Sequence, residues 1–183
     1  MVRQTRRPVP RGEFISAMRR VAASVTVVTT DGPAGRAGAT VSAFSSVSAD
    51  PPTVLVCLAA QSRIAGFVQE NKRFCVNVLP EASAGIADRF AGLHDRIVPD
   101  RFDGIEVFAP RGEAPVIDGA TAFQCEVQQV VRSGSHVIIL GHVQHVLDGA
   151  AAPLAYREGA YHRVVPHAGN LSEEPARNPA RMR

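Results

Sequence analysis

The stretch GATVSAFSSVSADPPTVLVCL, residues 38–58, carries most of the information about the fold of this chain. It starts inside an extended segment, residues 37–41, and ends in the apolar run 53–58, which is rich in β-branched side chains and typical of a buried strand. Pro51 and Pro52 separate the two segments, because proline has no backbone N–H to donate to a neighbouring strand. The region between them adds a dense group of small hydroxyl residues: Thr40, Ser42, Ser45, Ser46 and Ser48.

The rest of the chain continues this pattern of short strands and few helices. Apolar periodicity predicts helices at 13–23, 62–70 and 83–90, and β-branched runs predict strands at 25–30, 74–79, 122–131, 136–147 and 160–165. The first helix carries one apolar stripe, formed by Phe14, Ile15, Met18, Val21 and Ala22. Prolines, glycines and mixed charges at 92–117 indicate a long segment with little regular structure. Because the βαβα alternation of a parallel sheet is absent, the sequence predicts a mainly β fold, an antiparallel barrel or sandwich.

Composition points to one ordinary domain. The chain has 183 residues, of which 45% are hydrophobic and 20% charged, and this is enough for a sizeable core. Three cysteines are too few for a disulfide framework, and no apolar run reaches the ~18–20 residues that span a bilayer. We therefore expect a cytoplasmic protein without membrane attachment.

The net charge of +3 is concentrated at the ends of the chain. Residues 1–12 contain four arginines and no acidic residue, whereas the body is slightly acidic and poor in aromatic side chains. The body therefore offers no stacking platform for nucleic acid, and only the basic arm could contact a polyanion. We expect a disordered basic arm at 1–12, one domain at 13–166 and a disordered tail at 167–183.

Motifs of several common enzyme classes are missing. Gly32, Gly35 and Gly38 have the spacing of a dinucleotide-binding loop, but β-leaning residues follow them instead of a helix. The sequence contains no GxxxxGK[ST] phosphate loop and no GxSxG hydrolase motif. Neither a doubly wound nucleotide-binding fold nor a hydrolase of that type is therefore predicted.

The histidines and cysteines give no metal motif either. The six histidines form no HExxH pair, and alternation along the strand 136–147 places His145 on the opposite face from His136 and His142. Buried, unreactive thiols are expected because apolar strands hold all three cysteines: Cys57, Cys75 and Cys125. We predict no metal site.

Two neighbouring features could bind a ligand. The hydroxyl-rich residues 40–48 either form a polar exposed surface or bind the edge of a planar heteroaromatic ring, where donors and acceptors alternate. Ser62 is placed as the N-cap of the predicted second helix, and Arg63 follows it. Unpaired amides at a helix N-terminus and a guanidinium together make a phosphate receptor, although a plain cap with a solvated arginine explains the same residues.

An ordered series of segments resembles the flavin reductase family with the FMN-binding split-barrel fold. The series comprises the opening stretch 38–58, the SR pair at 62–63, RFCVNVL (73–79), RFAG (89–92), RFDGI (101–105), APVIDGA (114–120), GSHVIILGHV (134–143) and YREGAY (156–161). The resemblance covers residues 13–165. It implies a mainly β, antiparallel Greek-key split barrel with a few flanking helices, and a homodimer.

The resemblance also implies two groups of site residues. Those that match flavin-binding positions of the family are Ala39, Thr40, Val41, Ser42, Ser45, Ser46, Val47, Cys57, Ser62, Arg63, Phe90, Ala91 and Gly92. Those that match positions near bound NAD(P)H are His136, Tyr156, Arg157 and Tyr161. The family's Gly-Asp-His signature corresponds to Gly134, Ser135 and His136, so a role that needs the family's aspartate has no carboxylate here.

The implied activity is that of an NAD(P)H:flavin oxidoreductase. Its cofactors would be FAD or FMN, with NADH or NADPH as co-substrate, and it would supply reduced flavin to a partner monooxygenase or halogenase. Hydride transfer between stacked rings requires orientation rather than a catalytic side chain, so no catalytic residue is predicted. Two alternatives stay open: a non-catalytic flavin- or haem-binding split barrel that acts as carrier, sensor or scavenger, and a nucleic-acid binder that uses the basic arm.

Overall fold

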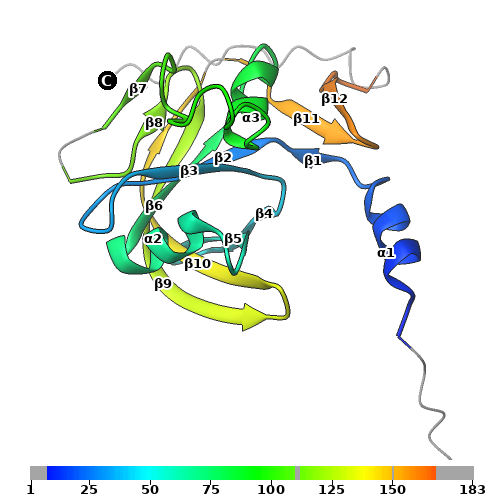
Figure 1. The fold of residues 1–183 in the computed structure, drawn as a ribbon, viewed down its shortest axis with the longest axis horizontal. Helices are drawn as coiled ribbons and strands as arrows, with labels where there is room; N and C mark the ends of the chain where they lie inside the picture. Colours follow the sequence, from blue (N-terminus) through cyan, green and yellow to red (C-terminus); the bar gives the residue numbers. More distant parts are fainter. Residues whose placement is uncertain (1–7, 110–111, 150, 168–183) are drawn as a thin grey trace, which may run out of the picture.

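The computed structural model describes residues 8–109, 112–149 and 151–167. The described chain is mainly β and antiparallel, as predicted, with helices α1 (Arg11–Met18), α2 (Arg63–Asn71) and α3 (Ala84–Phe90) (Figure 1). The main sheet has the spatial order β3 (Ala37–Val41), β2 (Thr26–Thr30), β6 (Arg73–Val78), β9 (Thr121–Ser133), β10 (His136–Leu147), β5 (Pro52–Ala59) and β4 (Phe44–Ala49). Two small sheets contain β1 (Ala23–Ser24), β11 (Leu154–Arg157) and β12 (Ala160–Arg163), and β7 (Val107–Phe108) with β8 (Val116–Ile117). None of the helices in the described ranges has the length and apolar character that crossing a membrane requires.

The two edge strands of the main sheet are neighbours in sequence, and this curves the sheet into an open barrel. β3 and β4 lie at opposite edges, yet only Ser42 and Ala43 connect them, so the sheet must curl until its edges meet. At the meeting point the Cys57 amide donates to the Ala43 carbonyl at 3.0 Å. Elsewhere in the described chain β3 pairs with β2 alone, so its second edge faces β5 across a split. Backbone N–H and C=O groups on that edge stay available for a ligand.

Two apolar clusters stabilise the barrel and its flank. The first fills the barrel and includes Val56 and Phe74, both fully buried, together with Ile64 from α2. The second lies under α3 and includes the fully buried Leu79 and Phe90. Full burial of one such side chain contributes roughly 1.5–3 kcal/mol, so α2 and α3 are each fixed to the barrel by their apolar faces.

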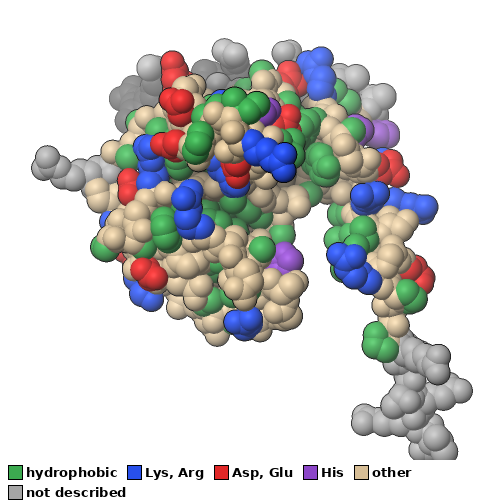
Figure 2. Space-filling view, in the orientation of Figure 1, with side chains coloured by type: hydrophobic (Ala, Val, Ile, Leu, Met, Phe, Trp, Pro, Cys, Tyr) green, Lys and Arg blue, Asp and Glu red, His purple; other side chains and the backbone are tan. Residues whose placement is uncertain are grey.

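Helix α1 differs most from the sequence prediction. The helix expected at 13–23 is shorter, since the chain turns after Met18 and residues Ala23–Ser24 pair with β11 as strand β1. α1 extends away from the barrel (Figures 1 and 2). Its apolar stripe is therefore uncovered, with Phe14 57% and Met18 50% exposed. The predicted arm 1–12 and tail 167–183 lie largely outside the described residues.

Three further differences have local causes. Residues 44–49, for which the sequence predicts no separate strand, form β4 because β5 supplies a hydrogen-bonding partner. Strand β11 was not predicted, since its sequence LAYR shows no strand alternation. The predicted separation of His142 and His145 onto opposite faces is wrong, because a register shift between Val143 and His145 interrupts the alternation.

Candidate functional site

A groove follows strand β3, and we call it the β3 groove. It consists of four adjoining hollows of about 310 to 420 Å³ each, in which neighbouring hollows share residues of the segment 39–43. We distinguish three parts by their side chains: a basic end with Ser62, Arg63 and Arg101, a middle with Cys57 and His136, and a tyrosine end with Asp88, Tyr156 and Tyr161.

The basic end is built on the N-terminus of α2. The Ser62 hydroxyl donates to the Ala59 carbonyl at 2.6 Å and accepts from the Ala65 amide at 3.4 Å, which confirms the cap predicted from sequence. Arg63 is the first residue of α2, and its guanidinium lies 5.8 Å from the centre of the Phe67 ring. The leading N–H groups of a helix have no carbonyl partner within it, so they combine with the guanidinium into a receptor for an anion.

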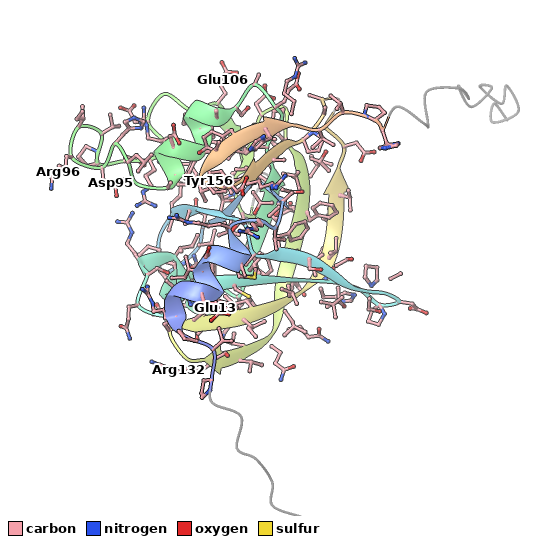
Figure 3. The ribbon with its side chains drawn as sticks, turned by 90° about the vertical axis from the view of Figure 1, so that its right-hand side faces the viewer. Glu13, Asp95, Arg96, Glu106, Arg132 and Tyr156 are labelled. Carbon is pink, nitrogen blue, oxygen red and sulfur yellow. The ribbon has the colours of Figure 1, made fainter. Side chains whose placement is uncertain are left out.

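A second arginine fixes the wall of the basic end. The Arg101 guanidinium donates to both carboxylate oxygens of Asp95, at 2.9 and 2.7 Å, and to the Gly38 and Phe90 carbonyls at 3.2 and 2.8 Å. The hydrogen bonds from Arg101 hold the pKa of Asp95, labelled in Figure 3, below its ordinary value. Arg101 thereby joins strand β3 to the end of α3 and to the loop that follows it.

The middle of the groove is the split between β3 and β5. Cys57 on β5 and His136 at the start of β10 line it together with the free edge of β3. The Ser135 hydroxyl lies 2.9 Å from Nδ1 of His136. Thr40 of β3 is fixed to α3, since its hydroxyl donates to the Ala87 carbonyl at 2.6 Å. The alternating backbone donors and acceptors of a strand edge suit the rim of a planar heteroaromatic ring.

The tyrosine end presents two aromatic rings and a carboxylate. The Tyr161 hydroxyl donates to Asp88 at 2.6 Å, and the Tyr161 and Tyr156 rings meet edge-on with their centroids 5.5 Å apart. Burial, together with the neighbouring Asp88, raises the pKa of Tyr161 to about 12. In the adjoining hollow beside α1, the Arg157 guanidinium lies 3.7 Å from the Glu158 carboxylate. The exposed side of this tyrosine pair offers a platform for a second planar ring.

The structure brings most of the predicted site residues together. Those that line the groove are Ala39, Thr40, Val41, Ser42, Cys57, Ser62, Arg63, Ala91, His136, Tyr156, Arg157 and Tyr161. Ser45, Ser46 and Val47 instead lie on β4, beyond β5, where they are exposed to solvent. Phe90 is fully buried, and Gly92 follows α3 in the left-handed region with φ 85°.

Sequence reasoning missed Asp88 and Arg101. Asp88 is 73 positions from its partner Tyr161, and Arg101 is 63 positions from Gly38, so no local pattern connects either pair. The sequence did contain one signal for the position of Arg101, because the Arg-Phe pair at 89–90 is repeated at 101–102. The two phenylalanine rings of these pairs pack edge-on with their centroids 4.9 Å apart.

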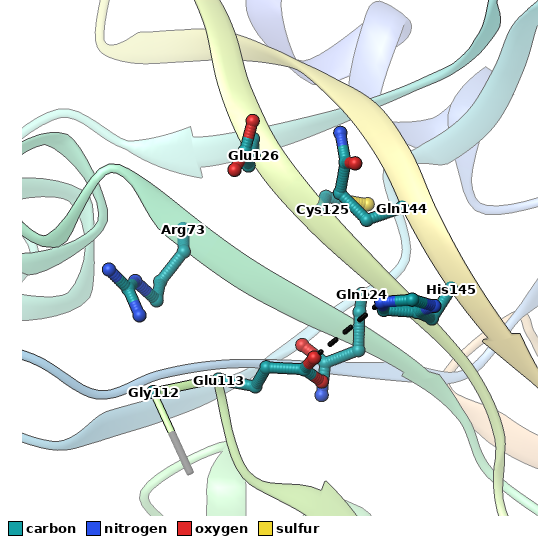
Figure 4. A pocket seen from close by; sticks show the side chains of 8 residues that line it. All are labelled: Arg73, Gly112, Glu113, Gln124, Cys125, Glu126, Gln144 and His145. Atoms are coloured by element: carbon teal, nitrogen blue, oxygen red, sulfur yellow. Dashed lines mark ion pairs between the residues drawn. The ribbon is translucent and has the colours of Figure 1, made fainter. Parts of the chain in front are cut away.

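A separate hollow of about 320 Å³ lies on strands β6, β9 and β10 (Figure 4). Its side chains include Arg73 and Glu126, and an ion pair in which His145 and Glu113 are 3.7 Å apart. It contains none of the predicted site residues. In the described parts of the chain, no group of three or more His, Cys, Asp or Glu side chains is arranged to hold a metal ion.

Comparison with known proteins now identifies the family. A family model described as "Flavin reductase like domain" matches residues 18–164. The chain belongs to the flavin reductase family. The resemblance of its ordered segments to that family is thereby confirmed.

Relatives of this flavin reductase match it over most of their length. It is 38% identical over 160 residues to "FMN reductase (NADH) RutF" of Ancylobacter novellus. The aligned region covers 86% of this chain and 87% of that relative. A similar solved structure is that of the NADH:FAD oxidoreductase SgcE6 of Streptomyces globisporus, in complex with NAD and FAD fragments. It superposes with a TM-score of 0.78 at 28% sequence identity, and the match covers 89% of this chain and 99% of SgcE6. BorF, the flavin reductase component of a bacterial two-component tryptophan halogenase, has a TM-score of 0.77 at 27% identity and covers 86% of this chain and 100% of that one.

Proposed function

We propose that this flavin reductase oxidises NADH and reduces a flavin, FMN or FAD, bound in the β3 groove. The observation that carries the proposal is the order of features along the groove: an anion receptor, then a free strand edge, then two tyrosines. A flavin nucleotide has its phosphate at one end and its heteroaromatic ring at the other, so it fits the anion receptor and the strand edge, and the tyrosines remain for the nicotinamide dinucleotide. The names of RutF and SgcE6 support both the flavin and NADH as substrates.

The chain's own residues serve to bind and orient. Ser62 and Arg63 bind the flavin phosphate, and the edge of β3 at 39–42 sets the direction of the ring. His136, Tyr156 and Tyr161 bind the dinucleotide so that its nicotinamide lies against the exposed face of that ring, and Arg157 contacts the dinucleotide from the adjoining hollow. With both bound, nicotinamide C4 supplies a hydride that flavin N5 accepts. Orientation of this kind accounts for up to roughly 7–11 kcal/mol of a barrier, so no acid–base pair is required.

We further infer a cytoplasmic homodimer that supplies reduced flavin to a flavin-dependent oxygenase or halogenase. The uncovered apolar stripe of α1, with Phe14, Ile15 and Met18 beside an open hollow, supports a second copy of the chain as its cover. The role of BorF as the flavin reductase component of a halogenase supports a partner enzyme of this kind. Light scattering should give twice the 19.5 kDa mass of one chain, and a single-chain mass would contradict the homodimer.

Substitution of Arg63 tests the proposal. The purified protein should oxidise NADH only when flavin is added, and Arg63→Ala should raise the KM for FMN about tenfold or more while that for NADH changes little, because a charge-assisted contact to phosphate is lost. Arg132→Ala, on the β9–β10 hairpin outside the groove, is the control and should leave both constants unchanged. Tight retention of flavin without NADH oxidation would instead favour the non-catalytic carrier. Equal changes in the KM for FMN and the KM for NADH would show that Arg63 does not bind the flavin phosphate.

A further inference from the structure

The basic end and the tyrosine end of the β3 groove differ in charge. Arg63 and Arg101 line the basic end, where Arg101 is already neutralised by Asp95. Among the described residues that line the hollow of the tyrosine end, Asp88 is the one with a charged side chain. A ligand that extends from the basic end to the tyrosine end therefore meets the Arg63 cation first and the Asp88 carboxylate last.

Asp88 has hydrogen-bonding capacity to spare. It lies on α3, one residue from the Ala87 carbonyl that anchors Thr40 of β3, so its position relative to the groove is well determined. One of its oxygens accepts the Tyr161 hydroxyl at 2.6 Å. A carboxylate offers about four acceptor positions, and a tyrosine uses one of them. The remainder can accept from a pair of neighbouring hydroxyl groups such as a ribose diol.

The same carboxylate disfavours a phosphate group. Two like charges held close together in a partly desolvated hollow repel each other, and the hollow of Asp88 supplies no cation within the described lining residues. The adjoining hollow does contain Arg19 and Arg157, but Arg157 is 3.7 Å from Glu158 and its charge is partly countered.

We propose that Asp88 determines the co-substrate of this enzyme, because it accepts hydrogen bonds from the adenosine ribose hydroxyls of NADH and repels the 2′-phosphate that NADPH carries there. The inference rests on the proposed function and on the binding of the dinucleotide at the tyrosine end. It assigns a role in specificity to a residue that lies outside the segments matched to NAD(P)H.

Steady-state kinetics with saturating FMN, and either NADH or NADPH as the varied substrate, test this assignment. Asp88→Asn keeps the size of the side chain and an acceptor for Tyr161 but removes the charge. Its ratio of kcat/KM for NADH to that for NADPH should fall by about tenfold or more, with NADPH improved in absolute terms. Tyr161→Phe removes the hydrogen bond and leaves the carboxylate, so it should change both co-substrates by a similar factor.

Asp118→Asn is the matched control, since it removes one carboxylate at an exposed position outside the groove and should leave the ratio unchanged. An unchanged ratio in Asp88→Asn, or an equal shift in Tyr161→Phe, would overturn the assignment. The wild-type protein tests the proposed function separately, because that function is refuted if the protein oxidises neither NADH nor NADPH. Calorimetric binding of NADH and NADPH to the same variants would then still decide the role of Asp88.

Discussion

Replacement of Gly38 by alanine should destabilise the protein and weaken flavin binding at the same time. Gly38 lies in β3, and an ideal Cβ there would be 2.5 Å from Cε1 and 2.7 Å from Cδ1 of Phe90, and 3.2 Å from Cζ of Phe102. Phe90 is fully buried and packs edge-on against Phe102, so its ring has no free space into which it can move. The strain must therefore be relieved largely by a displacement of β3.

The expected magnitude follows from the packing of this site. An extra methyl group in a well-packed core costs about 1–3 kcal/mol, and about 2–4 °C in Tm per kcal/mol is typical for a domain of this size. We therefore expect Gly38→Ala to lower the Tm by about 2–12 °C. The same displacement moves the adjoining edge of β3, so the KM for flavin should rise as well. Arg101, which donates to the Gly38 carbonyl, transmits the shift to the loop after α3.

Gly66→Ala supplies a matched control. Gly66 lies inside α2, and no atom comes within 4 Å of its ideal Cβ. The same methyl group should there stabilise the protein by about 0.4–1 kcal/mol, because alanine restricts the unfolded chain and favours helix. Thermal unfolding followed by circular dichroism compares the two variants. A Gly38→Ala protein that melts no lower than wild type would refute the packing argument, and restoration of Tm by a further Phe90→Leu change would identify the clashing ring.

Two further predictions concern titratable groups. Burial raises the pKa of the Cys75 thiol and raises that of Cys125 to about 12, so a thiol reagent should label only the partly exposed Cys57 in the native state, and bound flavin should slow that labelling; two or three fast thiols would contradict this. Tyr161, with its pKa raised to about 12 from an ordinary value near 10, stabilises the folded state below about pH 10, and this contribution is lost as the pH rises toward 12. The chain has two tyrosines and no tryptophan, so tyrosinate absorbance should show a late-titrating ring, and the absence of one would contradict the prediction. Earlier titration of that ring in Asp88→Asn would confirm that Asp88 contributes to the raised pKa beside burial.

The strands and the helix cap were largely predictable, because their signals are local. The β-branched run at 53–58 forms most of β5, the strand expected at 136–147 coincides with β10, and Ser62 caps α2. The predictions failed where pairing decided the outcome. The helix expected at 13–23 ends at Met18, and Ala23 and Ser24 pair with β11 instead. β11 itself becomes a strand through this pairing and its pairing with β12.

The candidate site likewise has features that the sequence predicts and features that only the tertiary structure decides. The sequence itself contains the hydroxyl residues, the Ser62–Arg63 pair and the ordered family segments, and these sufficed to indicate a flavin reductase. Most of the site residues that they indicated line the groove. Tertiary structure alone decided that the edge of β3 stays unpaired opposite β5, since this depends on how far a seven-stranded sheet curls before its edges meet. It alone also brought Asp88 to Tyr161 and Arg101 to Gly38. Contacts between residues more than sixty positions apart follow from the closure of the whole barrel, and no short pattern of residues encodes them.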